Sequence, residues 1–449
     1  MEMHQIRTVP LERATTTESW MDFIMGMFTD GFPSISQKGF QCSMLITLGA
    51  ILGLVCYLAC RPANSIRDLT GTKSDIFFKI PTKNNSMAKE YLKSRLQITR
   101  GVRKLHLYPN GWFNLIESSE VRLNGVKYVM ALGENFAVFR KSNGKVHVVD
   151  AFCPHLGANM GIGGSVKNDC LECPFHGWQF DGETGKCNNI PYAKKIPEFA
   201  KVRTWRSVEV NDIIFVWYHA EGIEPSYEPQ PQEEIMGRSY KFVGRTEFLM
   251  EGHIEDALNL ADYSHVDILH VPGMLTRGAD VDGSQRNNWL SSLIEVSQNI
   301  SWKPDEDQPH LAWTQQNSQL QIFKNIRLLN VDLRIKQVGP YFMELSATSN
   351  FGPFKAIVSV TPVAPLTLRV VGRMYTPPLG ILFGRIMLKA MENAFEQDAL
   401  IINTGKIHPE LNLLKEDGPK RLCRQWFSQF YSKKTTVLDR GTEDKNSSK

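Results

Sequence analysis

Residues Cys153–Trp178 read CPHLGANMGIGGSVKNDCLECPFHGW and contain two short Cys/His patterns, C-x-H at 153–155 and C-x-x-H at 173–176. Equal numbers of thiolates and imidazoles suit either a tetrahedral zinc ion or a [2Fe–2S] cluster with Cys on one iron and His on the other. Zinc fingers usually pair Cys with Cys and His with His, whereas each pattern here supplies one of each. The spacing therefore favours the iron–sulfur cluster over zinc. Its candidate ligands are Cys153, His155, Cys173 and His176.

The size and composition of the chain predict a multidomain protein. Its 449 residues exceed one ordinary domain, so two or three folded units are expected. The formal net charge of +4 is small for this length, and we expect no nucleic-acid partner. Eight cysteines are too few for a disulfide framework. Because cluster ligands must be thiolates, they indicate a reducing compartment.

An uncharged run of 22 residues, 39–60, predicts a single-pass transmembrane helix. As a helix it would be about 33 Å long, enough to cross a bilayer. The alternatives are a secretory signal peptide and a buried core helix. Basic residues follow the run and a net-negative tail, 1–38, precedes it. The positive-inside rule then places everything after Arg61 in the cytosol.

Short segments of alternating hydrophobicity begin after a basic linker, 61–110, and predict a small all-β domain at 111–220. This domain carries both Cys/His patterns. The expected strands are Val126–Leu132, Asn135–Arg140, Val146–Val149, Ser207–Val210 and Ile213–Tyr218.

A linker rich in Pro and Glu, 221–236, precedes a second predicted domain at 237–430. A long amphipathic helix, Leu382–Thr404, together with many strands predicts an α+β domain in which an antiparallel sheet wraps round a helix. We expect a loose charged tail at 431–449. The expected strands are Tyr240–Phe248, Ile322–Leu328, Tyr341–Leu345, Ala356–Thr361 and Thr367–Val371.

Residues Ile254–His270 predict a helix that contains a second candidate metal site, with His265 and His270 five residues apart. Five residues on an ideal helix turn by about 140°, too wide for easy chelation. The second His is therefore expected on a helix end distorted by Pro272. Two His and one carboxylate with open positions form a non-haem Fe(II) site for O₂. Asp262 is too close in sequence to be the third ligand, so the late helix should supply it. Its carboxylates are Glu392, Glu396 and Asp398.

The two Cys/His patterns, together with N-x-x-D-x-x-H-x-x-x-x-H from Asn259, resemble the Rieske non-haem iron oxygenases over about residues 105–430. The resemblance implies an all-β Rieske [2Fe–2S] domain and a helix-grip catalytic domain with a mononuclear Fe(II). It implies His265, His270 and Asp398 as the iron ligands. It further implies that Asp262 bridges toward a cluster His of a neighbouring subunit in a head-to-tail homotrimer.

Respiratory Rieske subunits form a second Rieske class with a membrane anchor. In that class an extra Cys in each cluster loop forms a disulfide, and the corresponding positions here are Ala158 and Phe175. The respiratory class also has no mononuclear-iron domain, so the oxygenases remain the better match. Cys170 and Cys187 lie near the patterns without an assigned role.

A membrane span ahead of a Rieske oxygenase is similar to the Neverland-type group of animal cholesterol 7-desaturases. This resemblance implies conversion of cholesterol to 7-dehydrocholesterol in ecdysteroid or related steroid biosynthesis. The protein would lie in the endoplasmic reticulum membrane with its catalytic part cytosolic. O₂ would be the co-substrate. Electrons from NAD(P)H would arrive through a separate reductase, such as a ferredoxin reductase, because no nucleotide-binding fingerprint is evident.

Two alternatives to desaturation stay open at the level of the sequence. One is a hydroxylase of the same family acting on a sterol or another lipid. The other is a membrane-tethered electron-transfer or redox-sensing protein whose second domain binds a ligand without turnover.

Overall fold

The computed structural model describes residues 46–47, 49–50, 53, 61–70, 104–257, 261–270, 294–323, 326–405, 412–435 and 437–439. The chain divides into two compact units, Met1–Arg61 and Pro62–Lys449, and both β-rich domains belong to the second. The tail 1–38 and all but five residues of the span expected at 39–60 lie outside the described residues. Within the described ranges, no helix is long and apolar enough to cross a membrane.

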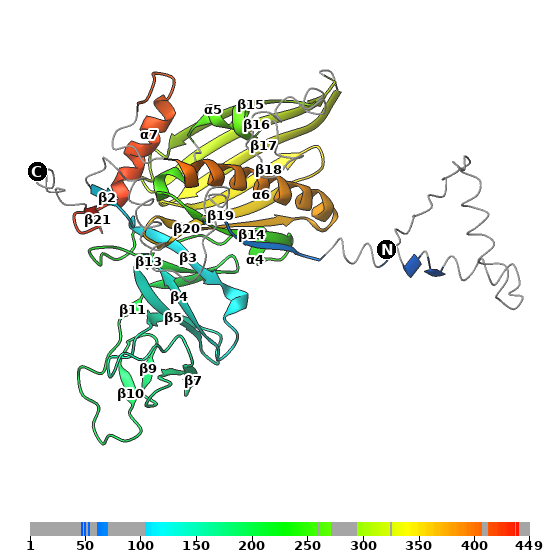
Figure 1. Cartoon of the computed structure of the whole chain (residues 1–449). Helices are drawn as coiled ribbons and strands as arrows, with labels where there is room; N and C mark the ends of the chain where they lie inside the picture. Colours follow the sequence, from blue (N-terminus) through cyan, green and yellow to red (C-terminus); the bar gives the residue numbers. More distant parts are fainter. Residues whose placement is uncertain are drawn as a thin grey trace, which may run out of the picture. The chain divides into compact units, whose positions relative to one another are not determined.

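Three small antiparallel sheets build the all-β domain that carries the Cys/His patterns (Figure 1). Their strand orders are β12-β13-β3, β11-β6-β5-β4 and β10-β9-β8-β7. The hairpin between β12 and β13 turns at Asn211 and Asp212, whose φ angles of 56° and 62° match the twist of the paired strands. The bounds are β3 Gly111–Glu117, β4 Val126–Ala131, β5 Glu134–Arg140, β6 Val146–Asp150, β7 Ser165–Lys167, β8 Cys170–Glu172, β9 Gln179–Asp181, β10 Cys187–Asn189, β11 Thr204–Trp205, β12 Ser207–Val210 and β13 Ile213–Tyr218.

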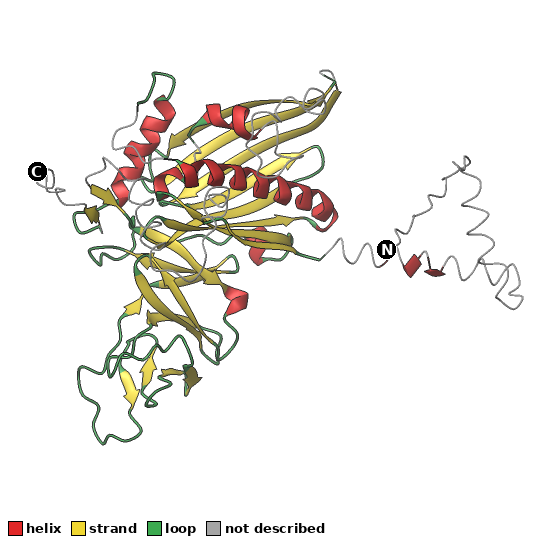
Figure 2. Cartoon of the chain, in the orientation of Figure 1, coloured by secondary structure: helices red, strands yellow, loops and turns green. Residues whose placement is uncertain are grey.

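An eight-stranded sheet forms the second domain, in the order β1-β14-β20-β19-β18-β17-β16-β15. Every neighbouring pair is antiparallel except β1 and β14, which run parallel. A long helix, α6 (Ile381–Thr404), lies across one face (Figure 2). The bounds are β1 Ala63–Asp68, β14 Lys241–Glu251, β15 Ile294–Pro304, β16 Leu311–Ile322, β17 Ile326–Val338, β18 Phe342–Ser349, β19 Phe354–Ala364 and β20 Thr367–Thr376.

Both faces of this sheet are covered, because alternate residues of each strand pack against different elements. On β20, a Cβ at Gly372 would meet α6 side chains, whereas the neighbouring Arg373 pairs with Glu117 of β3 at 2.8 Å. Asn114 of β3 donates to the Ser359 hydroxyl at 2.9 Å, and its carbonyl accepts from Arg369 at 2.7 Å. Buried hydrogen bonds of this kind fix the all-β domain to the face of the sheet opposite α6.

Smaller elements complete the described chain. A two-stranded antiparallel sheet joins β2 to β21. The remaining bounds are β2 Lys104–His106, β21 Val437–Asp439, α4 Glu233–Met236, a 3₁₀ turn Ile254–Asp256, α5 Tyr263–His265, a π-helical turn Val266–His270 and α7 Gly418–Phe427.

The α+β class is confirmed, and most expected elements agree with the structure to within five residues. The strand expected at Ile322–Leu328 is wrong, because β16 ends at Ile322 and Phe323 turns the chain with a φ of 53°. Residues 63–68, expected in the basic linker, form β1, and residues 437–439, expected in the loose tail, form β21. Both strands pair with partners far away in sequence, which a local pattern does not reveal.

Candidate metal centres

Two loops with the same backbone turn present the four candidate cluster ligands. In the first loop Gly157 N donates to Cys153 O and Cys153 N donates to Ala158 O, both at 2.9 Å. In the second loop Gly177 N and Cys173 N make the matching bonds at 3.0 and 2.8 Å. Gly157 and Gly177 have φ angles of 74° and 70°, a left-handed conformation that glycine adopts without strain. The repeated C-P-x-x-G sequence therefore folds into one turn, used twice.

The two loops and the small sheet β10-β9-β8-β7 form a region that we call the cluster tip. Its thiols are buried, and its imidazoles lie near the surface. Cys153 and Cys173 are only 3% and 2% exposed, whereas His155 and His176 are partly exposed, with their rings 4.6 Å apart. This arrangement fits a two-iron cluster with a sulfur-bound inner iron and an imidazole-bound outer iron. His155 Nδ1 is buried and finds no hydrogen-bond partner among the described residues, as expected for an atom reserved for a metal.

Burial, with a smaller contribution from the neighbouring Cys173, raises the pKa of the Cys153 thiol to about 11. Burial disfavours the charged thiolate form of Cys153 unless a cation lies beside it. A bound metal supplies that cation and converts the thiols to thiolates. The electrostatics of the tip therefore agree with a metal cluster.

Aromatic side chains that the sequence analysis missed hold the outer ligands in place. The His155 ring stacks on Trp178, with centroids 4.7 Å apart and planes at 9°. Trp178 in turn donates its indole N–H to the Tyr192 hydroxyl at 2.8 Å. Trp178 lies within the quoted pattern, but nothing in the sequence linked Tyr192 to it.

The second constellation lies on a π-helical turn, not on one continuous helix. The helix expected over Ile254–His270 is wrong, since the chain forms a 3₁₀ turn, then α5 ending at His265, then a π-helical turn over Val266–His270. Hydrogen bonds of a π-helix join residues five apart, so such residues lie one above the other. This turn places His265 and His270 on one face, with rings 5.0 Å apart.

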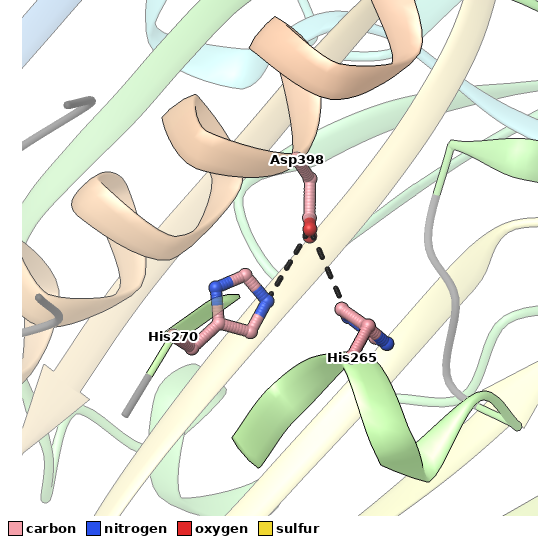
Figure 3. Close-up of side chains that lie close together, drawn as sticks. All are labelled: His265, His270 and Asp398. Atoms are coloured by element: carbon pink, nitrogen blue, oxygen red, sulfur yellow. Dashed lines mark ion pairs between the residues drawn. The ribbon is translucent and has the colours of Figure 1, made fainter. Parts of the chain in front are cut away.

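Asp398 of α6 faces both histidines (Figure 3). Its Oδ1 lies 3.3 Å from His270 Nε2 and 3.7 Å from His265 Nε2. One ligand atom from each of the three residues lies within 4.8 Å of the other two. The other two candidates on α6 point elsewhere: Arg67 of β1 pairs with Glu392 at 2.5 Å and with Glu396 at 2.9 Å. The structure thus selects Asp398 among the three carboxylates.

The hydrogen bonds of the two imidazoles leave their Nε2 atoms available. His265 Nδ1 lies 2.6 Å from the backbone carbonyl of Asp262, and His270 Nδ1 lies 3.1 Å from the Gln397 amide oxygen. Because both oxygens only accept, each Nδ1 carries the proton and each Nε2 presents a lone pair toward Asp398. Lone pairs facing a carboxylate repel unless a proton or a cation lies between them.

The carboxylate of Asp398 affects the pKa of His270. Burial lowers that pKa, but the hydrogen bond and charge of Asp398, together with the hydrogen bond to Gln397, raise it by more. Without a metal, the carboxylate of Asp398 thus favours a proton on His270, and a divalent cation can bind in place of that proton. Two His and one carboxylate fit Fe(II) with open coordination positions.

Asp262 stands beside the triad without joining it. Its Oδ2 accepts from Lys420 of α7 at 3.0 Å, and its Oδ1 lies 3.7 Å from His265 Nδ1. His265 and Lys420 together hold the pKa of Asp262 well below the ordinary value of an aspartate, although burial opposes this. Lys420 and Gln397 belong to no recognisable sequence pattern, so only the structure reveals them.

Residues of α4 and of strands β15 to β19 line a cavity that includes none of the candidate metal ligands. This cavity has a volume of about 740 Å³, and its lining includes Gln315, Arg334 and Lys355. Gln315 and Arg334 pair across β16 and β17. The cavity is therefore separate from both metal centres.

Family models match both β-rich domains. Residues 111–200 match the Rieske [2Fe-2S] domain, and residues 216–431 match the 3-ketosteroid 9alpha-hydroxylase C-terminal domain. The chain is 40% identical to a cholesterol 7-desaturase of Ciona intestinalis, covering 76% of this chain and 72% of that protein. It is 41% identical to a cholesterol 7-desaturase of Xenopus laevis, covering 76% and 77%.

A solved structure shares the fold. The crystal structure of dicamba monooxygenase bound to dicamba superposes with a TM-score of 0.55, covering 73% of this chain and 98% of that one. At 16% sequence identity, this likeness concerns the fold alone.

Proposed function

Since the chain belongs to the Rieske non-haem iron oxygenase family, and is therefore an oxidoreductase, we propose that it converts cholesterol to 7-dehydrocholesterol. The observation that carries the oxygenase assignment is the group of His265, His270 and Asp398, which brings three metal-binding atoms within 4.8 Å of one another. The two relatives named cholesterol 7-desaturase support the sterol and the reaction. Such a reaction would serve steroid hormone biosynthesis, including that of ecdysteroids.

We assign the metals to the residues that the structure brings together. The [2Fe–2S] cluster would be held by Cys153, His155, Cys173 and His176, and Fe(II) by His265, His270 and Asp398. When bound, the cluster supplies electrons singly and the iron supplies the activation of O₂. The chain's own part is to hold both Nδ1 protons on oxygen acceptors, so that the Nε2 atoms of the triad stay free to bind.

Electrons reach Rieske oxygenases through a reductase, and we propose NAD(P)H as their source here. In Figure 1 the strands β9 and β10 of the cluster tip lie apart from α5 and α6, with the other small sheets between them. A head-to-tail homotrimer would bring the tip of one copy to Asp262 of the next. Large apolar side chains around the tip support a docking role for it: Leu156, Phe175 and Tyr192 are all largely exposed.

We propose that residues 39–60 anchor the protein as a single transmembrane helix in the endoplasmic reticulum, with the metal centres in the cytosol. The uncharged run and the reduced thiols required by the cluster support this arrangement. Alkaline carbonate should leave the full chain in the membrane pellet of expressing cells. Release into the supernatant would remove the anchor from the proposal.

Sterol feeding tests the reaction itself. Cells that express the chain receive labelled cholesterol, and mass spectrometry follows its products, with Asp398→Ala as the inactive control. Loss of two hydrogens supports desaturation. Gain of one oxygen supports the second candidate, a sterol hydroxylase, which the match of residues 216–431 to a hydroxylase domain favours. Unchanged cholesterol would contradict the assignment of a sterol substrate.

A further inference from the structure

Four segments that are far apart in the sequence lie at one end of the eight-stranded sheet. Val331 of β17 pairs with Ser349, the last residue of β18, and Ala347 pairs with Phe354, the first residue of β19. At the same end, Thr376 of β20 pairs with Lys241 of β14, and β1 begins at Ala63 opposite Gly244. The β16–β17 turn, the β18–β19 turn, the start of α6 and the start of β1 therefore lie at this end. We call it the apolar end, because large hydrophobic side chains gather there.

Many of the hydrophobic side chains at the apolar end face solvent. Leu379, in the 3₁₀ turn before α6, is fully exposed, and on α6 Leu382 (67% exposed) and Ile386 lie four residues apart on one side of the helix. The β18–β19 turn adds Phe351, 53% exposed, whose ring lies 5.5 Å from that of Phe383 on α6. The β16–β17 hairpin adds Phe323 and Ile326, both more than half exposed. Single exposed hydrophobic residues are ordinary, but a gathering from three segments marks a docking surface.

The path of the chain identifies what this surface meets. Residues 39–60 form the uncharged run, and only Arg61 and Pro62 separate it from β1. Each residue step spans at most about 3.6 Å, so two intervening residues allow only a short separation between the run and β1. If the run crosses a bilayer, the apolar end must lie close to the membrane surface.

Strand β1 is tied firmly to the catalytic domain, so it does not act as a loose tether. It pairs with β14 over six residues, from Ala63 to Asp68. Arg67 bridges Glu392 and Glu396 of α6, and Asn403 of α6 donates to the carbonyl of Leu69 at 2.9 Å. The strand that directly follows the uncharged run is thus a rigid edge of the sheet.

We propose that the apolar end rests in the interfacial region of the lipid bilayer, as a second membrane contact in addition to the transmembrane run. The proposal rests on the membrane anchor proposed above. Exposed Leu, Ile and Phe side chains gain free energy by leaving water for the acyl boundary. The exposed Arg327, beside Ile326, suits the phosphate groups of the lipid headgroups. A sterol dissolved in the same bilayer would then meet the domain that carries the triad.

Photo-crosslinking of the full chain in phospholipid liposomes tests this contact. Benzoylphenylalanine replaces Phe351 in one variant and Ile223 in the control. The two positions are matched in exposure, at 53% and 55%. Ile223 lies toward the other end of the sheet: its carbonyl accepts from Trp217, which packs on Tyr227, and Tyr227 approaches Gly339 in the β17–β18 turn.

We expect the Phe351 variant to capture at least about fivefold more phospholipid than the Ile223 variant, because only the apolar end reaches the acyl boundary. Equal capture at the two positions would overturn the proposal. Sterol turnover is measured on the same samples. Lipid capture without turnover would support the docking surface and contradict the sterol reaction. Turnover with equal capture at the two positions would support the sterol reaction and contradict the docking surface.

A charge variant provides the second test. Leu379→Asp combined with Leu382→Asp should lower turnover of bilayer-dissolved cholesterol about tenfold, since two carboxylates oppose insertion. Turnover of detergent-solubilised cholesterol and the cluster spectrum should stay unchanged, as they should in the control Ile223→Asp under both conditions. Equal loss in detergent and in liposomes would show a folding defect and count against docking.

Discussion

The cluster tip and the iron triad differ in how far apart their ligands lie in the sequence. All four candidate cluster ligands lie between Cys153 and His176, on two loops with one repeated turn. The triad joins His265 at the end of α5 and His270 on the π-helical turn to Asp398, which is 128 residues beyond His270 and on another element. The first site therefore depends on local backbone geometry, and the second depends on how α6 packs across the sheet. Variants that damage one site and spare the other test this difference.

Removal of the distant ligand should have the largest effect. Asp398→Ala leaves two histidines without their carboxylate, so we expect loss of the mononuclear iron and of turnover, by about 10³-fold or more. Metal analysis should fall from three irons per chain toward two, with the cluster EPR signal unchanged. Glu396→Ala on the same helix, which removes only a partner of Arg67, should retain three irons. Full iron content in Asp398→Ala would move the third ligand elsewhere.

The converse variant acts on the local site. His176→Ala should abolish the Rieske absorption and EPR signal, because the outer iron loses one of two imidazoles. Turnover should stop as well, while the triad still binds one iron in a titration. A normal EPR spectrum would refute the cluster assignment, and loss of iron from the triad would show that the two sites are not independent.

A smaller effect is expected from the hydrogen bond behind His270. Gln397→Leu removes the oxygen that holds His270 Nδ1 at 3.1 Å, and such partners are typically worth about 10–100-fold in metal affinity. Equilibrium dialysis with Fe(II) measures the change. Gln397→Glu keeps an acceptor oxygen and should bind more tightly than Gln397→Leu. Equal affinity in these two variants would show that the hydrogen bond does not orient the ligand.

The smallest effect concerns the stability of the cluster tip alone. Asp181 ends β9, and its pKa falls to about 2, because the effect of burial is outweighed by hydrogen bonds from Thr184 and Lys141. A lowered pKa stabilises the fold above the unfolded value of about 3.9, and that stability is lost as the pH falls toward 2.

Asp181→Asn should therefore lower the free energy of unfolding of the tip at pH 7 and have little effect near pH 2. We expect a loss of about 1 kcal/mol at pH 7, less than the full pKa shift implies, because water screens this partly exposed group. Urea denaturation at the two pH values, followed by tip fluorescence, provides the measurement. Glu183→Gln, in an exposed ion pair with Lys145, should cause no measurable change. A loss for Asp181→Asn that does not depend on pH would exclude the carboxylate charge as its cause.

The elements that the sequence predicted well are those with a strong local period. Helix α6 begins one residue from its expected start and ends where expected, because its 24 residues keep one apolar face against the sheet. The hairpin from β12 to β13 is likewise confirmed. The strand predicted at Ile322–Leu328 is wrong because the hydrophobic pattern continues through the turn at Phe323. Strand β1 carried no local signal, since its partner β14 lies about 180 residues away.

The sequence by itself determined the cluster candidates, because one turn of backbone, with Gly at its left-handed position, places Cys and His only two or three residues apart. It also determined the pair His265 and His270. Only the tertiary structure decided that a π-helical turn aligns this pair, that Arg67 holds Glu392 and Glu396 away, and that Asp398 and Gln397 reach the histidines. The physical reason is that three carboxylates on one helix are chemically alike, and only the packing of α6 determines which of them faces the metal.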